Sequence, residues 1–163
     1  MNKIRIKNWD EYFIKLAMLV SEKSKDPSTQ VGCVIIGPDN EIRSTGFNGF
    51  PRGVNELDDT RWERPAKYEW VEHAERNAVF NAAHIGIQLK GCRAYLNWEP
   101  RPCVECCKGF IQAGIIEVIG PDIPFPSGGS RKDWKFEVST IMMNEANITY
   151  RIVEWKDVKE THD

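Results

Sequence analysis

The sequence predicts a three-layer α/β/α fold, in which a mixed sheet of five strands carries helices on both faces. Two observations support this fold class. Two strand-like segments near the N-terminus predict a hairpin, and helical patterns then alternate with short apolar runs. The hairpin supplies antiparallel strands, whereas the alternation favours parallel strands joined by helices. The 163 residues, 41% of them hydrophobic, suit a single domain over residues 1–163 with a core at about 9–153.

The first part of the chain predicts a helix, a hairpin and a long loop. Residues 9–24 place apolar side chains at helical spacing, and Asn8 can cap the helix start. Val31–Ile36 is apolar and rich in β-branched residues, and Glu41–Thr45 resumes after Gly-Pro-Asp-Asn, which predicts a β-hairpin. Glycines and prolines interrupt residues 46–70, so we expect a loop; one this long is typical of a lid or binding segment.

From residue 73 onward, helical and strand patterns alternate. Ala74, Ala78 and Ala82 share one helix face, and their small size predicts close packing against the sheet. Pro102 and Gly114 suit the start and the end of another helix. The expected elements are helices at 73–84, 103–113 and 133–146, strands at 93–97, 115–119 and 148–153, and a Pro/Gly-rich connection at 121–130.

Two short motifs carry the chemistry: His-Ala-Glu at 73–75 and Pro-Cys-Val-Glu-Cys at 102–106. Cys103 and Cys106 are three residues apart at a helix start, so both sulfurs face one side of that helix. His73 opens the preceding helix and adds an imidazole. One nitrogen and two thiolates leave a fourth position for water, which is typical of a catalytic Zn²⁺ site.

Glu75 completes this site as the predicted proton shuttle. Zinc makes a hydroxide available near neutral pH. Glu75 can take a proton from the water and deliver protons to a ring nitrogen and a departing amine. The combined pattern H-x-E…P-C-x-x-C is the signature of zinc-dependent deaminases, in which the glutamate is not a ligand.

Other interpretations of the cysteines are weaker. C-x-x-C alone also occurs in redox sites, but here it accompanies H-x-E. A closed structural zinc site would need Cys107, and neighbouring helix positions diverge by roughly 100°. We therefore expect Cys107 to be a small buried side chain. Cys33 and Cys92 lie in or beside apolar strands and are expected in the core.

Beyond these motifs, nearly the whole chain resembles the deoxycytidylate (dCMP) deaminase family. Residues 24–32, Ser-Lys-Asp-Pro-Ser-Thr-Gln-Val-Gly, are similar to the family's approach to its first strand. Residues 45–53 resemble its G-Y-N-G-x-P-x-G loop, with Phe47 in place of the usual Tyr. Residues 68–82 and 111–115 also match. The Asn-Gly loop is the feature that points to dCMP.

The resemblance implies a reaction in which dCMP and water give dUMP and ammonia. It implies that Asn48 contacts the sugar and that backbone around Ala74 and Cys103 holds the base. It also implies a homo-oligomer, often a hexamer. A substrate phosphate needs cationic or N–H partners, and Lys25 and Ser28 are candidates by position.

The resemblance further implies regulation, with dCTP as activator and dTTP as inhibitor. The effector would bind near Gly49, Phe50, Arg52 and Gly53. Glycines there let backbone N–H groups approach phosphate, and Arg52 supplies charge. Mg²⁺ can accompany such a nucleoside triphosphate.

One departure from the family keeps other substrates open. Tyr95 to Cys103 spans eight residues, where the family has six, and the segment lies beside the base pocket. Asn97, Trp98 or Glu99 could select dCTP, a 5-substituted dCMP or cytidine. A tRNA-adenosine deaminase is disfavoured by the Asn-Gly loop. A non-catalytic, zinc-stabilised nucleotide-binding module would have no need of a carboxylate at the position of Glu75.

The overall charge and hydropathy favour a cytoplasmic protein with a small nucleotide substrate. The net charge of −2 argues against a large nucleic-acid footprint. No apolar run approaches the roughly 20 residues that span a bilayer, and the N-terminus lacks the apolar stretch of a signal peptide. We therefore expect no membrane partner.

Overall fold

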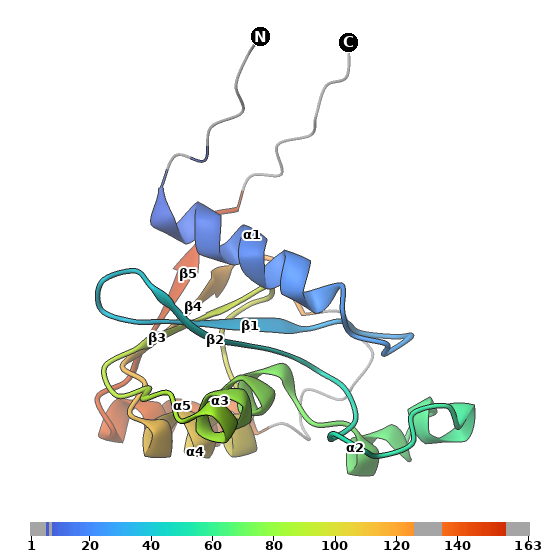
Figure 1. Ribbon diagram of the computed structural model, residues 1–163. Helices are drawn as coiled ribbons and strands as arrows, with labels where there is room; N and C mark the ends of the chain where they lie inside the picture. The colour runs from blue at the N-terminus through green and yellow to red at the C-terminus, as the bar shows by residue number, and fades with distance from the viewer. Residues whose placement is uncertain (1–5, 7, 126–134, 156–163) are drawn as a thin grey trace, which may run out of the picture.

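The computed structural model describes residues 6, 8–125 and 135–155, and these form the predicted three layers (Figure 1). A five-stranded sheet has the order β2-β1-β3-β4-β5. β1 pairs antiparallel with β2 and β3, while β3, β4 and β5 are parallel, so the sheet is mixed. The strands are β1 (Gly32–Ile36), β2 (Ile42–Phe47), β3 (Arg93–Leu96), β4 (Glu117–Pro121) and β5 (Thr149–Val153).

Helices cover both faces of the sheet because its strand residues alternate between two apolar clusters. Cys33 and Ile35 pack toward α3, α4 and α5, whereas Val34 and Ile36 pack toward α1. Figure 1 shows α1 on one face and α3, α4 and α5 on the opposite face. The helices are α1 (Trp9–Ser21), α3 (Ala74–Ile85), α4 (Val104–Ala113) and α5 (Phe136–Glu145).

The contact between β2 and α3 is as close as the small residues predict. Ala74, Ala78 and Ala82 are completely buried. A Cβ atom added at Gly46 would lie 2.3 Å from the backbone nitrogen of Ala78, so only glycine fits there. This contact fixes the start of α3, where His73 and Glu75 lie, against the sheet.

Several element boundaries differ from the predictions. α1 ends at Ser21 instead of residue 24, because the amides of Glu22 to Ser24 form turn hydrogen bonds. β4 begins two residues late, since Ile115 N bonds Phe110 O in the helix end. β2 extends to Phe47, which pairs with Gly32. The predicted helix starts at Phe136; residues 133–134, like 126–130 of the connection, lie outside the described residues.

The prediction of a featureless loop at 46–70 is wrong. The segment contains a 3₁₀ turn, η1 (Asp59–Trp62), and a short helix, α2 (Lys67–Trp70). The Asp58 side chain accepts a hydrogen bond from Thr60 N at 3.1 Å and so caps η1. Trp62 is buried and stacks on Phe50, with ring centroids 4.3 Å apart. This local packing was not visible as helical periodicity.

Within the described residues, the helices are too short or too polar to form a membrane span.

Candidate active site

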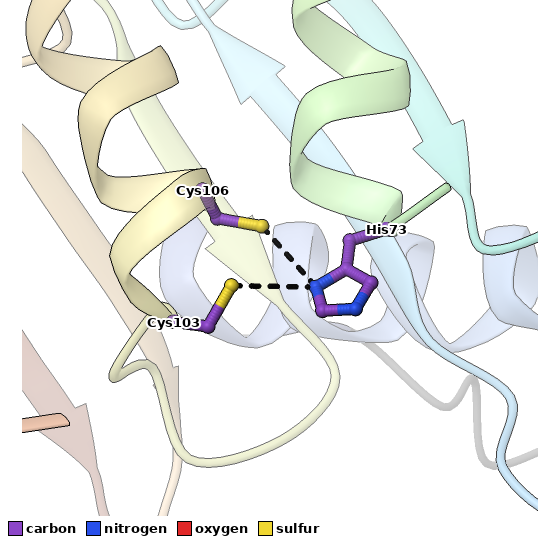
Figure 2. Close-up of side chains that lie close together, drawn as sticks. All are labelled: His73, Cys103 and Cys106. Carbon is purple, nitrogen blue, oxygen red and sulfur yellow. Dashed lines mark hydrogen bonds between the residues drawn. The ribbon is translucent and has the colours of Figure 1, made fainter. Parts of the chain in front are cut away.

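The site is built where two helices begin side by side. His73 is the N-cap residue of α3 and Cys103 that of α4, both with extended backbone. Neither side chain caps its own helix, and neither residue type is a preferred N-cap. Instead of capping their helices, the two side chains point toward one another across the gap between α3 and α4. Cys106 approaches them from the first turn of α4 (Figure 2).

The three side chains converge closely enough to bind one metal ion. The His73 Nδ1 atom lies 3.4 Å from the Sγ atom of Cys103 and 3.4 Å from that of Cys106. All three ligand atoms lie within 4.8 Å of one another. Cys103 and Cys106 are buried, which shields the site from bulk water. Figure 2 shows both sulfurs directed at the same imidazole nitrogen.

Burial and mutual contact shift the pKa of each of these three groups. A hydrogen bond with Cys106 lowers the pKa of the Cys103 thiol, burial raises it, and a bond with His73 lowers it again, to about 4. Burial, the largest single effect, lowers the pKa of His73, but the hydrogen bond with Cys103 and the nearby negative charges together outweigh it and raise the pKa to about 9. Burial holds the pKa of Cys106 well above its usual range. Metal binding must displace the remaining protons.

The donor set fits zinc. One imidazole and two thiols match the ligands of catalytic zinc sites that keep a fourth position open, whereas Mg²⁺ prefers oxygen ligands. Cys107 does not join the group: its thiol faces the carbonyl of Ser139 at 3.5 Å on the far side of α4. Cys33, Cys92 and Cys107 are all buried.

Glu75 lies in the first turn of α3 and lines a cavity together with His73 and Ala74. It is 8% exposed, and burial raises its pKa more than the charge of His73 lowers it. A carboxyl group with a raised pKa suits transfer of protons in both directions. The other lining residues are Asp26, Thr29, Val31, Asn48, Arg64, Lys67, Tyr68, Val71 and Phe125.

Asn48, predicted to contact the sugar, lines this cavity and also holds its wall together. Its Oδ1 accepts from Val31 N at 2.8 Å. Its Nδ2 donates to Thr29 O at 2.9 Å and to the Asp26 carboxylate at 3.2 Å. One lone pair of Oδ1 is left for a further donor.

A buried ion pair in the cavity wall was missed by the sequence reasoning. Lys67 Nζ lies 2.6 Å from Asp26 Oδ2, and both side chains are less than a tenth exposed. Burial raises the pKa of Asp26, but hydrogen bonds from Lys67 and Ser28 outweigh it and lower the pKa. Lys67 lies on α2, inside the segment predicted to be a loop, and is 41 residues from Asp26.

The two residues predicted by position for phosphate binding lie differently. Lys25 is exposed, pairs with Glu56 and is not among the cavity-lining residues. Ser28 is exposed and is not among the cavity-lining residues; its hydroxyl donates to Asp26 at 2.9 Å and accepts from Lys67 at 2.8 Å.

The predicted effector loop joins the metal site through its first glycine. Gly49 and Glu72 exchange two backbone hydrogen bonds, at 2.9 and 3.1 Å, just before His73. Phe50 packs on Trp62, and Arg52 is exposed and contacts Asn81. Gly53 has φ of 80°, a conformation that favours glycine.

The lengthened segment before Cys103 reaches the cavity indirectly. Trp98 donates to the carbonyl of Gln30 at 2.9 Å, and its ring packs edge-on against Phe125 with centroids 6.0 Å apart. Phe125 in turn lines the cavity. Glu99 pairs with Arg101 and is not among the cavity-lining residues.

An open His/Cys/Cys set beside a buried glutamate, on a layered α/β/α fold, is the arrangement of zinc-dependent deaminases. A family model described as the cytidine and deoxycytidylate deaminase zinc-binding region matches residues 7–120. The chain belongs to this family of enzymes.

Individual relatives agree with this assignment. The chain is 38% identical over 149 residues to a deoxycytidylate deaminase of Homo sapiens, covering 88% of this chain and 78% of the relative. It is 41% identical over 143 residues to an uncharacterized deaminase of Aliivibrio fischeri, covering 88% and 92%. A crystal structure of dCMP deaminase from the cyanophage S-TIM5, in complex with dCMP and dUMP, has the same fold: the TM-score is 0.68, at 22% identity, over 91% of this chain and 100% of that one.

Proposed function

We propose that this enzyme converts dCMP and water to dUMP and ammonia. The convergence of Cys103 and Cys106 on His73, which lines one cavity together with Glu75, carries the reaction class. The 38% identity to a deoxycytidylate deaminase over 88% of the chain supports the substrate. The dCMP and dUMP bound to the cyanophage deaminase support a nucleotide of this size in a fold of this kind.

The chain's own contribution to the reaction centres on Glu75. When bound by His73, Cys103 and Cys106, zinc supplies a water of lowered pKa and hence a nucleophile near neutral pH. Glu75 would take one proton from that water as the water oxygen bonds to C4 of the cytosine ring, and would deliver this proton to N3. It would then take the second proton from the hydroxyl group on C4 and deliver it to the amino group, so that the C4 carbonyl forms, the C4–N bond breaks and ammonia leaves. Burial of Glu75 keeps bulk water from competing for these protons.

The contacts to the base and to the sugar remain predictions that the family resemblance implies. Ala74 lines the cavity between His73 and Glu75, where its backbone can hold the base. Asn48 keeps one acceptor lone pair for the sugar. Lys25 and Ser28 remain predictions for the phosphate and are tested below against a different residue.

The substrate is tested by ammonia release from dCMP, CMP, dCTP, deoxycytidine and a 5-substituted dCMP. We expect the highest kcat/KM for dCMP. Glu75→Gln should bind zinc normally but lose roughly 100- to 10,000-fold in kcat, the usual contribution of a general acid–base. Glu69→Gln, at an exposed carboxylate on α2, is the matched control. Zinc-loaded protein that releases ammonia from no cytosine or adenine compound would rule out the enzyme.

Regulation, assembly and location are further parts of the proposal, and they rest mainly on the resemblance. We propose a single-domain homo-oligomer, by resemblance a hexamer, in the cytoplasm. dCTP, with Mg²⁺, would activate it and dTTP would inhibit it at Gly49, Phe50, Arg52 and Gly53. The paired backbone of Gly49 and Glu72 supports this site, because it links the effector loop to the residue before His73.

A further inference from the structure

Two cations line the cavity near α2, and their surroundings differ. Lys67 is 6% exposed and belongs to the helix itself, whereas Arg64 is exposed and precedes it. Both belong to the cavity wall that also includes Tyr68, while Glu75 belongs to the wall at the start of α3. This difference decides which of the two cations can form an ion pair with a negatively charged group that enters the cavity.

The charge of Lys67 is already neutralised. Its ammonium group donates to the Asp26 carboxylate at 2.6 Å and to the Ser28 hydroxyl at 2.8 Å. The pKa of Asp26 is lowered, although burial opposes this, by hydrogen bonds from Lys67 and Ser28, so it stays ionised at neutral pH. Lys67 and Asp26 thus add no net charge to the cavity. The third N–H group of Lys67 can still donate a hydrogen bond, but it brings no net charge because Asp26 neutralises the ammonium group.

Arg64 carries a charge that no carboxylate among the described residues neutralises by an ion pair. Its Nε donates to the Tyr68 hydroxyl at 3.0 Å, which holds the guanidinium against another residue of the cavity wall. This bond leaves the four N–H groups of the two terminal nitrogens. Those groups form the planar fork that binds phosphate through two parallel hydrogen bonds.

We infer that Arg64, held by Tyr68, is the residue that recognises the 5′-phosphate of the nucleotide, and that Lys67 is not. This inference rests on the proposed function, which supplies a nucleotide monophosphate. A phosphate carries a charge of about −1.5 to −2 at pH 7, so it avoids the carboxyl of Glu75 and turns toward α2. The base then lies at the start of α3, where the reaction requires it. Arg64 thereby sets both the phosphate preference and the orientation of the substrate.

The inference is tested by the affinity of the zinc-loaded protein for dUMP and for deoxyuridine, which lacks the phosphate. Arg64→Gln should weaken dUMP binding by about 10- to 100-fold, the usual effect of losing a charge-assisted pair. Deoxyuridine binding should change by less than about twofold, because deoxyuridine has no phosphate group for Arg64 to contact. Arg64→Lys should lose less than Arg64→Gln, because it keeps the charge without the fork.

Arg43→Gln is the matched control for the change of charge, because Arg43 pairs with Glu41 on the β1–β2 hairpin. An equal loss for dUMP and deoxyuridine in Arg64→Gln would overturn the inference in favour of a structural role. So would unchanged dUMP binding, or a loss of dUMP affinity in Lys25→Gln instead. A wild-type protein that binds dUMP no better than deoxyuridine would overturn it as well.

These outcomes separate the inference from the proposed function. Wild-type protein that binds dUMP selectively but releases no ammonia from dCMP would contradict the function alone. Wild-type protein that deaminates dCMP while Arg64→Gln keeps the full phosphate preference would contradict the inference alone.

Discussion

The two walls of the cavity are built in different ways. The metal wall is formed by His73, Ala74 and Glu75 at the start of α3. Cys103 and Cys106, at the start of α4, are not among the cavity-lining residues and approach this wall at the His73 imidazole. Both helices pack against the sheet. The charged wall uses Asp26 from a loop and Lys67 from a helix of four residues. The first wall is held by helix and sheet packing, the second by an ion pair and its hydrogen bonds.

This difference indicates a division of work within one cavity. The metal wall needs fixed geometry, and helix starts anchored by Ala74 and Gly46 provide it. In the inferred orientation of the substrate, the charged wall faces the flexible, charged phosphate group. Arg64 lines this wall and has an exposed side chain. Changes to the metal wall should therefore remove the reaction, and changes to the charged wall should alter stability and nucleotide preference.

The largest effect should follow from changing one ligand of the metal site. Cys106→Ser should lose the zinc and lower kcat at least about a thousandfold, because a water molecule off the metal is far less acidic than one on it, whose pKa is about 7. Zinc per chain and ammonia release measure the two effects.

The neighbouring residue provides the control for that change. Cys107→Ser should keep one zinc per chain, since the Cys107 thiol faces the Ser139 carbonyl. Loss of zinc from the Cys107 variant, or its retention by Cys106→Ser, would show that the ligand set is wrong.

A smaller effect, on stability, should follow from breaking the ion pair of the charged wall. Lys67→Met leaves the Asp26 carboxylate buried without its cation, which typically costs about 3–5 kcal/mol of unfolding free energy. Adding Asp26→Asn should recover part of the loss, because it removes the stranded charge and keeps an acceptor for Ser28 and Thr29. Urea unfolding of both single variants and the double variant measures the coupling. Equal losses that simply add would show that the pair contributes little.

The contrast between the walls also explains what the sequence could predict. Spacing within each motif places Cys103 beside Cys106 at one helix start, and the combined signature pairs them with His73 and Glu75, although the two motifs are 30 residues apart. The layered fold was equally accessible, because short continuous apolar runs such as that of β1 mark strands that are buried on both faces. Each strand run and each of the two motifs involves residues close together in the sequence.

The charged wall depends on contacts across the chain, and local patterns did not reveal it. Lys67 lies 41 residues from Asp26, on a helix too short to show periodicity. The one local signal was Asp-Pro-Ser-Thr at 26–29, where the Asp26 carboxylate accepts from the amides of Ser28 and Thr29. That signal predicts a turn but gives no information about which lysine completes it. The fold supplies Lys67, which the sequence did not single out.

The acid dependence of stability should be a property of the charged wall. The folded-state pKa of Asp26 lies below its ordinary value of 3.8. Its contribution to stability is therefore complete above that value and is lost as the pH falls through the folded pKa. The difference in unfolding free energy between wild type and Asp26→Asn should be large near neutral pH and shrink below about pH 4.

Urea unfolding of wild type and Asp26→Asn, from about pH 7 down to about pH 2.5, measures this difference. Asp10, whose pKa the hydrogen bond from Arg151 lowers, adds the same trend in both proteins and so cancels. A difference that stays constant over the whole range would mean that Asp26 does not titrate as the ion pair requires.

The smallest effect should come from Ser28, which the two lines of reasoning place differently. In the structure its hydroxyl donates to Asp26 and accepts from Lys67, so it bridges the two members of the ion pair. Ser28→Ala should cost about 1 kcal/mol of unfolding free energy, the usual net value of such a hydrogen bond, because Asp26 and Lys67 still meet. If Ser28 instead contacted the phosphate, the variant would bind dUMP more weakly while its affinity for deoxyuridine stayed the same. Measuring both quantities on this one variant decides whether the serine belongs to the wall or to the substrate site.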